Sequence, residues 1–282
     1  MLEVHEPPRA WPDGLGIRAI GRSLATNREL IALLTRRELS QRYRGSALGA
    51  AWPVLQPVLL LGIYLFVFAV VFGAEWQEEW ARGRAGYALT VFAGLVTFQI
   101  FSESVGSASR LIPAHANFVK RVVFPLEVLP LVKVLAALVQ GAIGIAILVV
   151  AMMALGRVPG PEALLLPLVW IPFALFTLGV VYAVSAIAVY LRDLDQVIGL
   201  VVTMLFFGSA IFYPLSRVPE TIQPLLASLP TAVAVEGTRQ LLLAGRLPWG
   251  SASMVSLASS LLVLVLGYAC FQKSRRGFAD VL

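Results

Sequence analysis

Long apolar runs alternate with short polar segments along most of this sequence. Six runs reach the length that a helix needs to cross a bilayer, which is roughly 17 to 25 residues. The third and fourth runs also contain Pro130, Pro167 and Pro172, so we expect those helices to be kinked or tilted. The pattern therefore predicts an all-α integral membrane protein with six transmembrane helices. These cover residues 52–72, 86–105, 127–155, 163–189, 197–213 and 251–271.

A basic segment precedes the first run. Thr26, followed three residues later by Glu29, matches the start of a helix, and Gly45 matches an end. Apolar residues come first in this helix and basic residues follow, which predicts an N-terminal interfacial amphipathic helix. A solvated basic helix is the alternative. The residues expected to meet the membrane surface are Arg36, Arg37, Arg42, Tyr43 and Arg44.

The composition supports the membrane class. Hydrophobic residues make up 59% of the 282 residues and charged residues only 13%, whereas soluble domains carry about a quarter charged residues. The net charge of +6 comes from basic residues beside the apolar runs, which indicates lipid headgroups rather than nucleic acid as their partner. Residues 1–25 are polar and Pro-rich and are expected to form a flexible cytosolic arm, with residues 26–282 as one transmembrane domain.

The distribution of Lys and Arg orients the predicted helices. If the N-terminus lies in the cytosol, fifteen of these residues fall in cytosolic segments and six in outer segments. Positive charge is enriched on the cytosolic side of membrane proteins. We therefore expect a multi-pass protein with both termini in the cytosol.

Two connections carry more pattern than simple links. The cytosolic segment from Ser107 to Leu126 mixes apolar and basic residues, and the outer segment from Pro214 to Gly250 is half apolar. The outer segment predicts two short helices that lie against or dip into the outer leaflet. Within it, Glu236 and Arg239 are three residues apart and pair if they share a helix face, either as a functional contact or as a minor surface pair.

A very short cytosolic turn joins the fourth and fifth predicted helices. It contains Arg192, Asp193 and Asp195. Two interpretations remain open: a solvated turn that sets topology, or a second contact for a cytosolic partner.

Aromatic residues gather on two of the predicted helices. Their spacing of four residues places Tyr64, Phe68 and Phe72 on one face of the first. Aromatic faces pack against the C–H faces of sugar rings, so such a stripe suits a glycan path, whereas ordinary helix packing is the alternative. The aromatics that crowd the outer half of the fifth helix are Phe206, Phe207, Phe212 and Tyr213.

Several kinds of chemistry lack a signature. The predicted helices carry no pattern of acids or histidines expected of an ion relay. His5 and His115 have no ligand-spaced partners, so we expect no metal site, and no catalytic arrangement stands out. The phosphate-binding pattern G-x-x-x-x-G-K-[ST] is absent. We expect a chain that is not an enzyme and binds no cofactor itself; if nucleotide drives it, another subunit binds that nucleotide.

Five motifs in order resemble those of one transporter family. They are ELSQRYRGSALGAAWPVLQP, NFVKRVVFPLEVLPL, YLRDLDQV, IFYPLSRVPE and FADVL. Together they resemble the permease of ABC-2 type polysaccharide exporters, with O-antigen and teichoic acid export permeases as the nearest relatives. The resemblance covers residues from about 30 to 282. One departure is Leu229-Pro230, where relatives usually carry Asn-Pro.

The resemblance implies the architecture of a whole transporter. It implies a homodimer in the bacterial cytoplasmic (inner) membrane, joined by two copies of a cytosolic ABC ATPase that use ATP and Mg. The first and fifth helices would line a channel for a lipid-linked glycan, and the two short outer helices, with Glu236 and Arg239, would form an external gate. A coupling helix that docks on the ATPase would include Arg110, Asn117, Phe118, Lys120 and Arg121, with Arg192 and Asp193 as a second contact.

The expected function is outward movement of a lipid-linked polysaccharide by the permease subunit of an ATP-driven exporter. One alternative is an ABC-2 exporter of a small lipid, drug or peptide. A second, from another class, is an ATP-independent channel or carrier, which would show ionisable residues within the membrane or broken helices in corresponding halves. A membrane-embedded glycosyl-transferring enzyme is a further alternative and would require acidic residues at a reaction centre.

Overall fold

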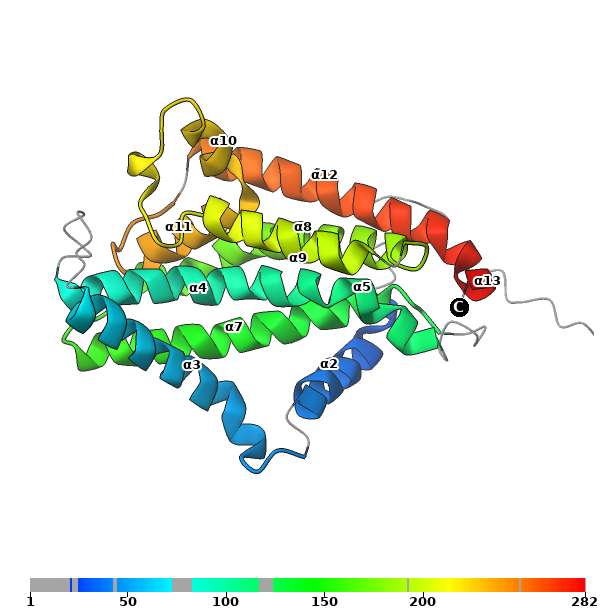
Figure 1. Cartoon of the computed structure of the whole chain (residues 1–282), viewed down its shortest axis with the longest axis horizontal. Helices are drawn as coiled ribbons and strands as arrows, with labels where there is room; N and C mark the ends of the chain where they lie inside the picture. Colours follow the sequence, from blue (N-terminus) through cyan, green and yellow to red (C-terminus); the bar gives the residue numbers. More distant parts are fainter. Residues whose placement is uncertain are drawn as a thin grey trace, which may run out of the picture.

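The computed structural model describes residues 21, 25–42, 45–72, 83–116, 124–191, 193–248 and 250–281. They form a helical bundle, drawn in Figure 1. The long helices are α2 (Arg28–Arg42), α3 (Trp52–Tyr64), α4 (Arg84–Gly106), α7 (Val128–Ala154), α8 (Leu166–Ile187), α9 (Leu194–Gly208), α11 (Pro230–Leu242) and α12 (Ser251–Ser274). The shorter ones are η1 (Gly49–Ala51), η2 (Leu65–Val71), α5 (Ala108–Leu111), η4 (Pro113–His115), η5 (Pro161–Leu165), η6 (Leu215–Arg217), α10 (Gln223–Ser228), η7 (Arg275–Gly277) and α13 (Phe278–Val281).

Five of the six predicted transmembrane helices have the length and apolar character to cross a membrane. They are Trp52–Val71, Ala85–Gly106, Val128–Ala154, Pro161–Ile187 and Ser251–Gly277. The fifth predicted run forms α9, an apolar helix of 15 residues. It ends at Gly208 rather than at the expected Tyr213 because the chain turns at Ala210, whose φ of 52° lies in the left-handed region.

Two of the prolines expected to kink the long helices lie where they cause little disturbance. Pro130 falls in the first turn of α7 and Pro167 in the first turn of α8, where a missing N–H breaks no helical hydrogen bond. Pro172 lies inside α8 and Pro57 inside α3. Of these four prolines, Pro57 and Pro172 therefore each remove an N–H that a helix interior would use.

The helix α4 forms the core, and α3 forms an edge. Of the most apolar stretch of α4, 72% is buried, against 11% for the combined stretch of α3 and η2. Figure 1 shows α4 running through the middle of the bundle, with α3 and α7 on one side and α12 on the other. The side chains that α3 and η2 turn outward are apolar, including Val58, Ile63, Phe66 and Val70.

The helices α8 and α12 cross at two glycines. A Cβ on Gly267 would lie 2.0 Å from the carbonyl oxygen of Gly179, and a Cβ on Gly179 would lie 2.6 Å from the backbone of Leu264. Side chains at these positions would force the two backbones apart, so the glycines permit this close approach.

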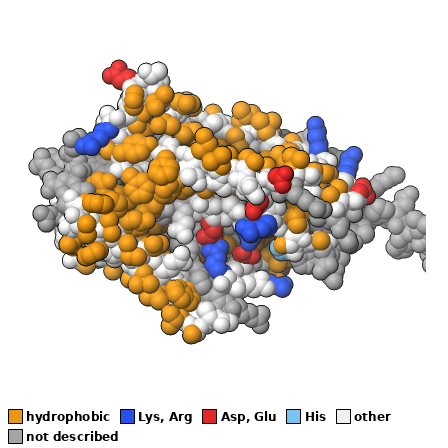
Figure 2. Space-filling view, in the orientation of Figure 1, with side chains coloured by type: hydrophobic (Ala, Val, Ile, Leu, Met, Phe, Trp, Pro, Cys, Tyr) orange, Lys and Arg blue, Asp and Glu red, His pale blue; other side chains and the backbone are white. Residues whose placement is uncertain are grey.

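The bundle has two chemically different ends. The basic end carries α2, α5 and η7, and the distal end carries α10 and α11 (Figure 1). Figure 2 shows acidic and basic side chains gathered beside α2, while hydrophobic side chains cover much of the remaining visible surface. The two short helices predicted between the fifth and sixth runs are α10 and α11. Of these, α11 is buried within the bundle, and its Thr238 hydroxyl accepts a hydrogen bond from Trp170 of α8 at 3.1 Å.

Candidate functional site

The aromatic residues predicted on the first transmembrane helix stack along its length. The rings of Tyr64 and Phe68 are nearly parallel, with centroids 5.9 Å apart, and Phe68 and Phe72 follow at 6.0 Å. The backbone after Tyr64 adopts the wider turns of a π-helix over the seven residues of η2. Such turns are rare and occur often at functional sites.

The aromatic residues of α9 and its following turn join the same cluster. Phe212 lies 6.4 Å from Phe68, and Phe206 lies 5.5 Å from Phe212 and 5.4 Å from Phe207. The Tyr213 hydroxyl donates to the Phe207 carbonyl. The structure thus brings together the two aromatic groups that the sequence placed on separate helices.

Sequence reasoning missed two members of this aromatic cluster, Tyr87 and Phe98 of α4. Tyr87 lies 5.1 Å from Phe68 and donates a hydrogen bond of 2.8 Å to the carbonyl of Phe212, and Phe98 lies 5.4 Å from Phe206. No local pattern marked them because Tyr87 and Phe98 are eleven residues apart in the chain, and only the packing of α4 against η2 and α9 brings them to the same cluster. The cluster therefore spans α3, η2, α4 and α9.

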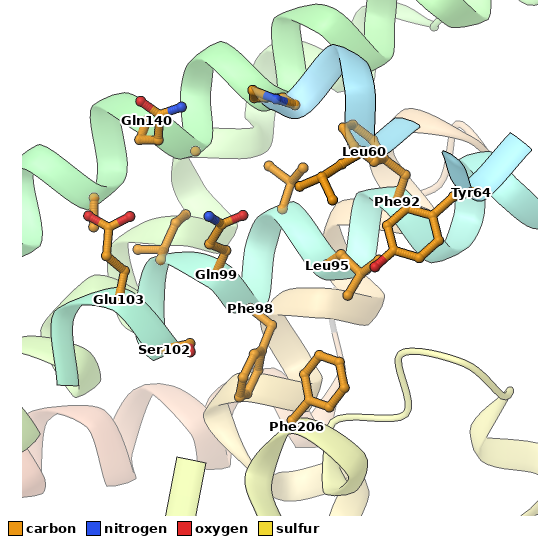
Figure 3. Close-up of a pocket in the computed structure, with 16 residues that line it drawn as sticks. Leu60, Tyr64, Phe92, Leu95, Phe98, Gln99, Ser102, Glu103, Gln140 and Phe206 are labelled. Atoms are coloured by element: carbon orange, nitrogen blue, oxygen red, sulfur yellow. The ribbon is translucent and has the colours of Figure 1, made fainter. Parts of the chain in front are cut away.

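A cavity of about 350 Å³ continues from the aromatic cluster toward the basic end. It lies among α3, α4 and α7, and Phe206 of α9 also lines it. Figure 3 shows Tyr64, Phe92 and Leu95 on one side of this space and Gln99, Ser102 and Glu103 on the other. Tyr64 and Phe206 belong both to the cavity and to the aromatic cluster, so the two features are continuous.

The side chain of Gln140 fastens α3 to α7 beside this cavity. Its amide Nε2 donates to the carbonyl of Pro53 at 2.9 Å. That carbonyl lacks its usual helical donor because Pro57, four residues later, has no N–H. The remaining amide atom, Gln140 Oε1, is buried without a hydrogen-bond partner among the described residues.

Ion pairs attach α2, the helix predicted to be interfacial, to the bundle. Glu38 accepts from Lys133 of α7 at 2.5 Å, and Arg42 pairs with Glu103 of α4. Ile31 is buried against Val128 and Val132. The predicted residues Arg36 and Arg37 are exposed, whereas Tyr43 and Arg44 lie outside the described residues. Three of the four basic residues assigned to the membrane surface can thus be placed, and Arg42 among them contacts protein.

The two predicted cytosolic contacts meet at Asp195. Ser109 of α5 donates to Asp195 Oδ1 at 2.5 Å, and Arg110 Nε lies 3.8 Å from the same carboxylate. Asp193 is exposed beside the start of α9. The other predicted residues of this region, Asn117, Phe118, Lys120, Arg121 and Arg192, lie outside the described residues.

Glu236 and Arg239 do pair, but not at the surface as the alternative of a minor surface pair predicted. The two charges do approach to 3.7 Å, but the Arg239 side chain is only 1% exposed. Its guanidinium donates to the carbonyls of Thr90 at 3.1 Å, Ala210 at 3.0 Å and, through Nη2, Ile211. A planar fork of five donors suits several acceptors at once. Periodicity could not reveal this, because the acceptors come from α4 and the turn after α9.

The described residues include no group of three or more His, Cys, Asp or Glu side chains placed to hold a metal ion. The charged side chains near the bundle interior are instead paired with one another. One further pair, Arg275 and Glu127 at 2.5 Å, joins the end of α12 to the start of α7.

These features define a multi-pass helical membrane protein with a buried distal helix and a basic end. Residues 29–243 match the ABC-2 type transporter family, and the chain belongs to that family. It is 31% identical to the O-antigen export system permease protein RfbA of Myxococcus xanthus, over 92% of this chain and 97% of that protein. It is 27% identical to the protein of the same name from Klebsiella pneumoniae, over 90% of this chain and 95% of that protein.

Proposed function

We propose that this chain is the membrane-spanning permease of an ATP-driven exporter that moves a lipid-linked polysaccharide of the O-antigen type outward. The similarity to O-antigen export permeases over nearly the whole of both chains carries this proposal. The aromatic cluster supports it, since ring faces bind sugar C–H faces without fixed charge. The basic end then lies in the cytosol with both termini, and the membrane is the bacterial inner membrane.

Two copies of the chain form the path. The helices α3 and α9 support this part of the proposal because they expose large apolar side chains that no other part of the described bundle covers, among them Val58, Ile63, Val201 and Met204. With α9 counted as a crossing, the chain crosses the membrane six times. The first crossing (α3) and the fifth (α9) of each copy then face the other copy. A glycan between them is shielded from the hydrocarbon.

The energy comes from two ATPase subunits at the basic end. The chain itself has no phosphate-binding loop, and the α5 segment and the start of α9 are joined through Ser109 and Asp195. A push on either segment is therefore passed directly to α9. The ATPase drives transport only if it binds the two conformations of the permease with different affinity.

The external gate consists of α10 and α11. Arg239 joins α11 to α4 and to the turn after α9, so α11 and the end of α9 move together. Opening then displaces Phe206 and Phe212 along with this unit.

Export from cells tests this function. Deleting the gene for this chain should retain the finished glycan inside, and adding the gene back should restore surface glycan, detected with a glycan-specific antibody. Purification in mild detergent should recover an ATPase subunit with the chain. Normal surface glycan without the chain, or co-purified substrate that mass spectrometry identifies as a drug or peptide, would contradict the proposal.

A further inference from the structure

The cavity beside the aromatic cluster has a polar end that helix packing does not explain. Gln99, Ser102 and Glu103 lie three or four residues apart along α4 and line this end. Gln99 is exposed and Ser102 is half-buried, and neither side chain makes a hydrogen bond with the described residues. Polar side chains within a transmembrane helix are costly when they face hydrocarbon. Their position here therefore indicates a polar occupant.

The opposite end of the cavity is apolar and aromatic. Leu60 and Tyr64 of α3 face Phe92 and Leu95 of α4 across it, and Phe206 closes the side toward α9 (Figure 3). Small-molecule sites in proteins combine such apolar walls with a few polar groups in volumes of roughly 300 to 1,000 Å³. The cavity, at about 350 Å³, is large enough for a small ring compound.

The charge of the lining decides which polar groups fit. Glu103 is the charged side chain among the described lining residues, and Arg42 neutralises it. A phosphate would have to displace that carboxylate from Arg42 and would find no other basic side chain in the lining. A neutral ring with several hydroxyl groups needs both donors and acceptors, which two amides, a hydroxyl and a carboxylate supply.

We propose that this cavity binds a neutral sugar unit at the lipid-linked end of the glycan before the glycan enters the aromatic path. Gln99 and Ser102 hydrogen-bond its hydroxyls, and Tyr64 packs against its ring. The inference rests on the proposed function and adds a loading site to it. Because Tyr64 and Phe206 line both features, a sugar leaving the cavity passes onto the next aromatic face without contacting lipid.

Photo-crosslinking in cells tests the loading site. Benzoylphenylalanine replaces Gln99 in the cavity, Phe68 in the aromatic cluster, or Leu262, an α12 side chain that is 60% exposed outside both. Cells that make the glycan and cells blocked in its first step are irradiated, and adducts are probed with the glycan antibody. We expect glycan adducts from position 99 in the glycan-making cells alone, and none from position 262.

The outcomes separate the two proposals. Adducts at position 68 without adducts at position 99 would overturn the loading site but would leave the proposed function, export of the glycan, standing. Absence of glycan adducts at both positions, together with surface glycan that does not depend on this chain, would overturn both. A lipid adduct at position 99 in blocked cells, detected by mass spectrometry of the purified chain, would identify an ordinary membrane lipid as the occupant and also overturn the loading site.

Substitution at one position provides a second readout. Gln99→Leu keeps the size of the side chain but removes its hydrogen bonds, whereas Gln99→Asn keeps the amide. We expect surface glycan to fall about tenfold in Gln99→Leu, the effect of one lost hydrogen bond on binding, and to stay within about twofold in Gln99→Asn. Leu262→Ala, at an exposed position of α12 outside both features, should leave export and ATP hydrolysis by the purified complex unchanged. Equal export by the two Gln99 variants would contradict the inference.

Discussion

The side-chain amide of Gln140 in α7 donates a hydrogen bond to the carbonyl of Pro53 in α3, which Pro57 leaves without its helical donor. The donor–acceptor distance is 2.9 Å, and Pro57 removes the N–H that would otherwise serve that carbonyl. A side chain from one helix thus completes the backbone of another in the wall of the cavity. Since little else buries α3, this contact helps to set where the first transmembrane helix stands.

Gln140→Leu should therefore destabilise the protein. The Pro53 carbonyl would lose its donor, and we expect a loss of about 1 kcal/mol in the free energy of unfolding, measured by thermal denaturation in detergent. Pro57→Ala restores the missing N–H and provides the matched control. In that background Gln140→Leu should cost measurably less. Equal costs with and without Pro57 would contradict the assigned role.

Arg239→Gln should lower stability by about 3 kcal/mol, because it removes a buried fork that serves carbonyls on two segments. Arg239→Lys should not restore it, since a single ammonium cannot reproduce the planar geometry. Denaturant titration followed by circular dichroism measures both. Arg217, which is exposed in η6, gives the control: Arg217→Lys should be neutral. Full stability of Arg239→Lys would show that charge alone suffices.

Gly267→Ala should separate α8 from α12. The added methyl would lie 2.0 Å from the Gly179 carbonyl oxygen, and relief of that overlap should cost about 1 to 3 kcal/mol. Gly62→Ala is the comparison, because nothing lies within 4 Å of the corresponding Cβ in α3. We expect that variant to be neutral or up to about 1 kcal/mol more stable. Equal melting temperatures for Gly267→Ala and Gly62→Ala would refute the close crossing of α8 and α12.

The Glu38–Lys133 pair should respond to charge reversal. Glu38→Lys places two cations together and should cost about 1 kcal/mol, since both side chains are partly exposed. Adding Lys133→Glu should recover most of that loss. Raising the salt concentration should shrink the difference between the single variant and the parent chain. A double variant no more stable than the single one would argue against direct pairing.

Asp195→Ala should weaken coupling between ATP hydrolysis and export. It removes the acceptor that joins Ser109 of α5 to the start of α9. We expect surface glycan to fall while the purified complex still contains the ATPase subunit. Asp193→Ala removes a neighbouring charge and serves as the comparison. Because Asp193 is proposed to contact the ATPase, this variant should instead reduce the amount of ATPase subunit that purifies with the chain. Identical behaviour of the two variants would contradict the separate roles.

Properties that depend on local sequence were predicted well. Five of the six apolar runs form helices long enough to cross a membrane, and the other forms the shorter α9, because apolar length is a property of contiguous residues. The same holds for the two short helices between α9 and α12, since prolines separate them in the chain. The order of five motifs was also sufficient to predict the family, which the comparisons confirmed.

What the sequence could not determine depends on residues that are distant in the chain. The burial of Arg239 follows from carbonyls at Thr90, Ala210 and Ile211, of which the last two lie in the turn after α9. The role of Gln140 required knowing that α7 lies beside Pro53. Apolar periodicity identifies helices but not their neighbours, because hydrophobic burial is non-directional and many packings satisfy it. The sequence by itself therefore determined the helices and the family, and the tertiary structure alone decided which polar groups meet within the bundle.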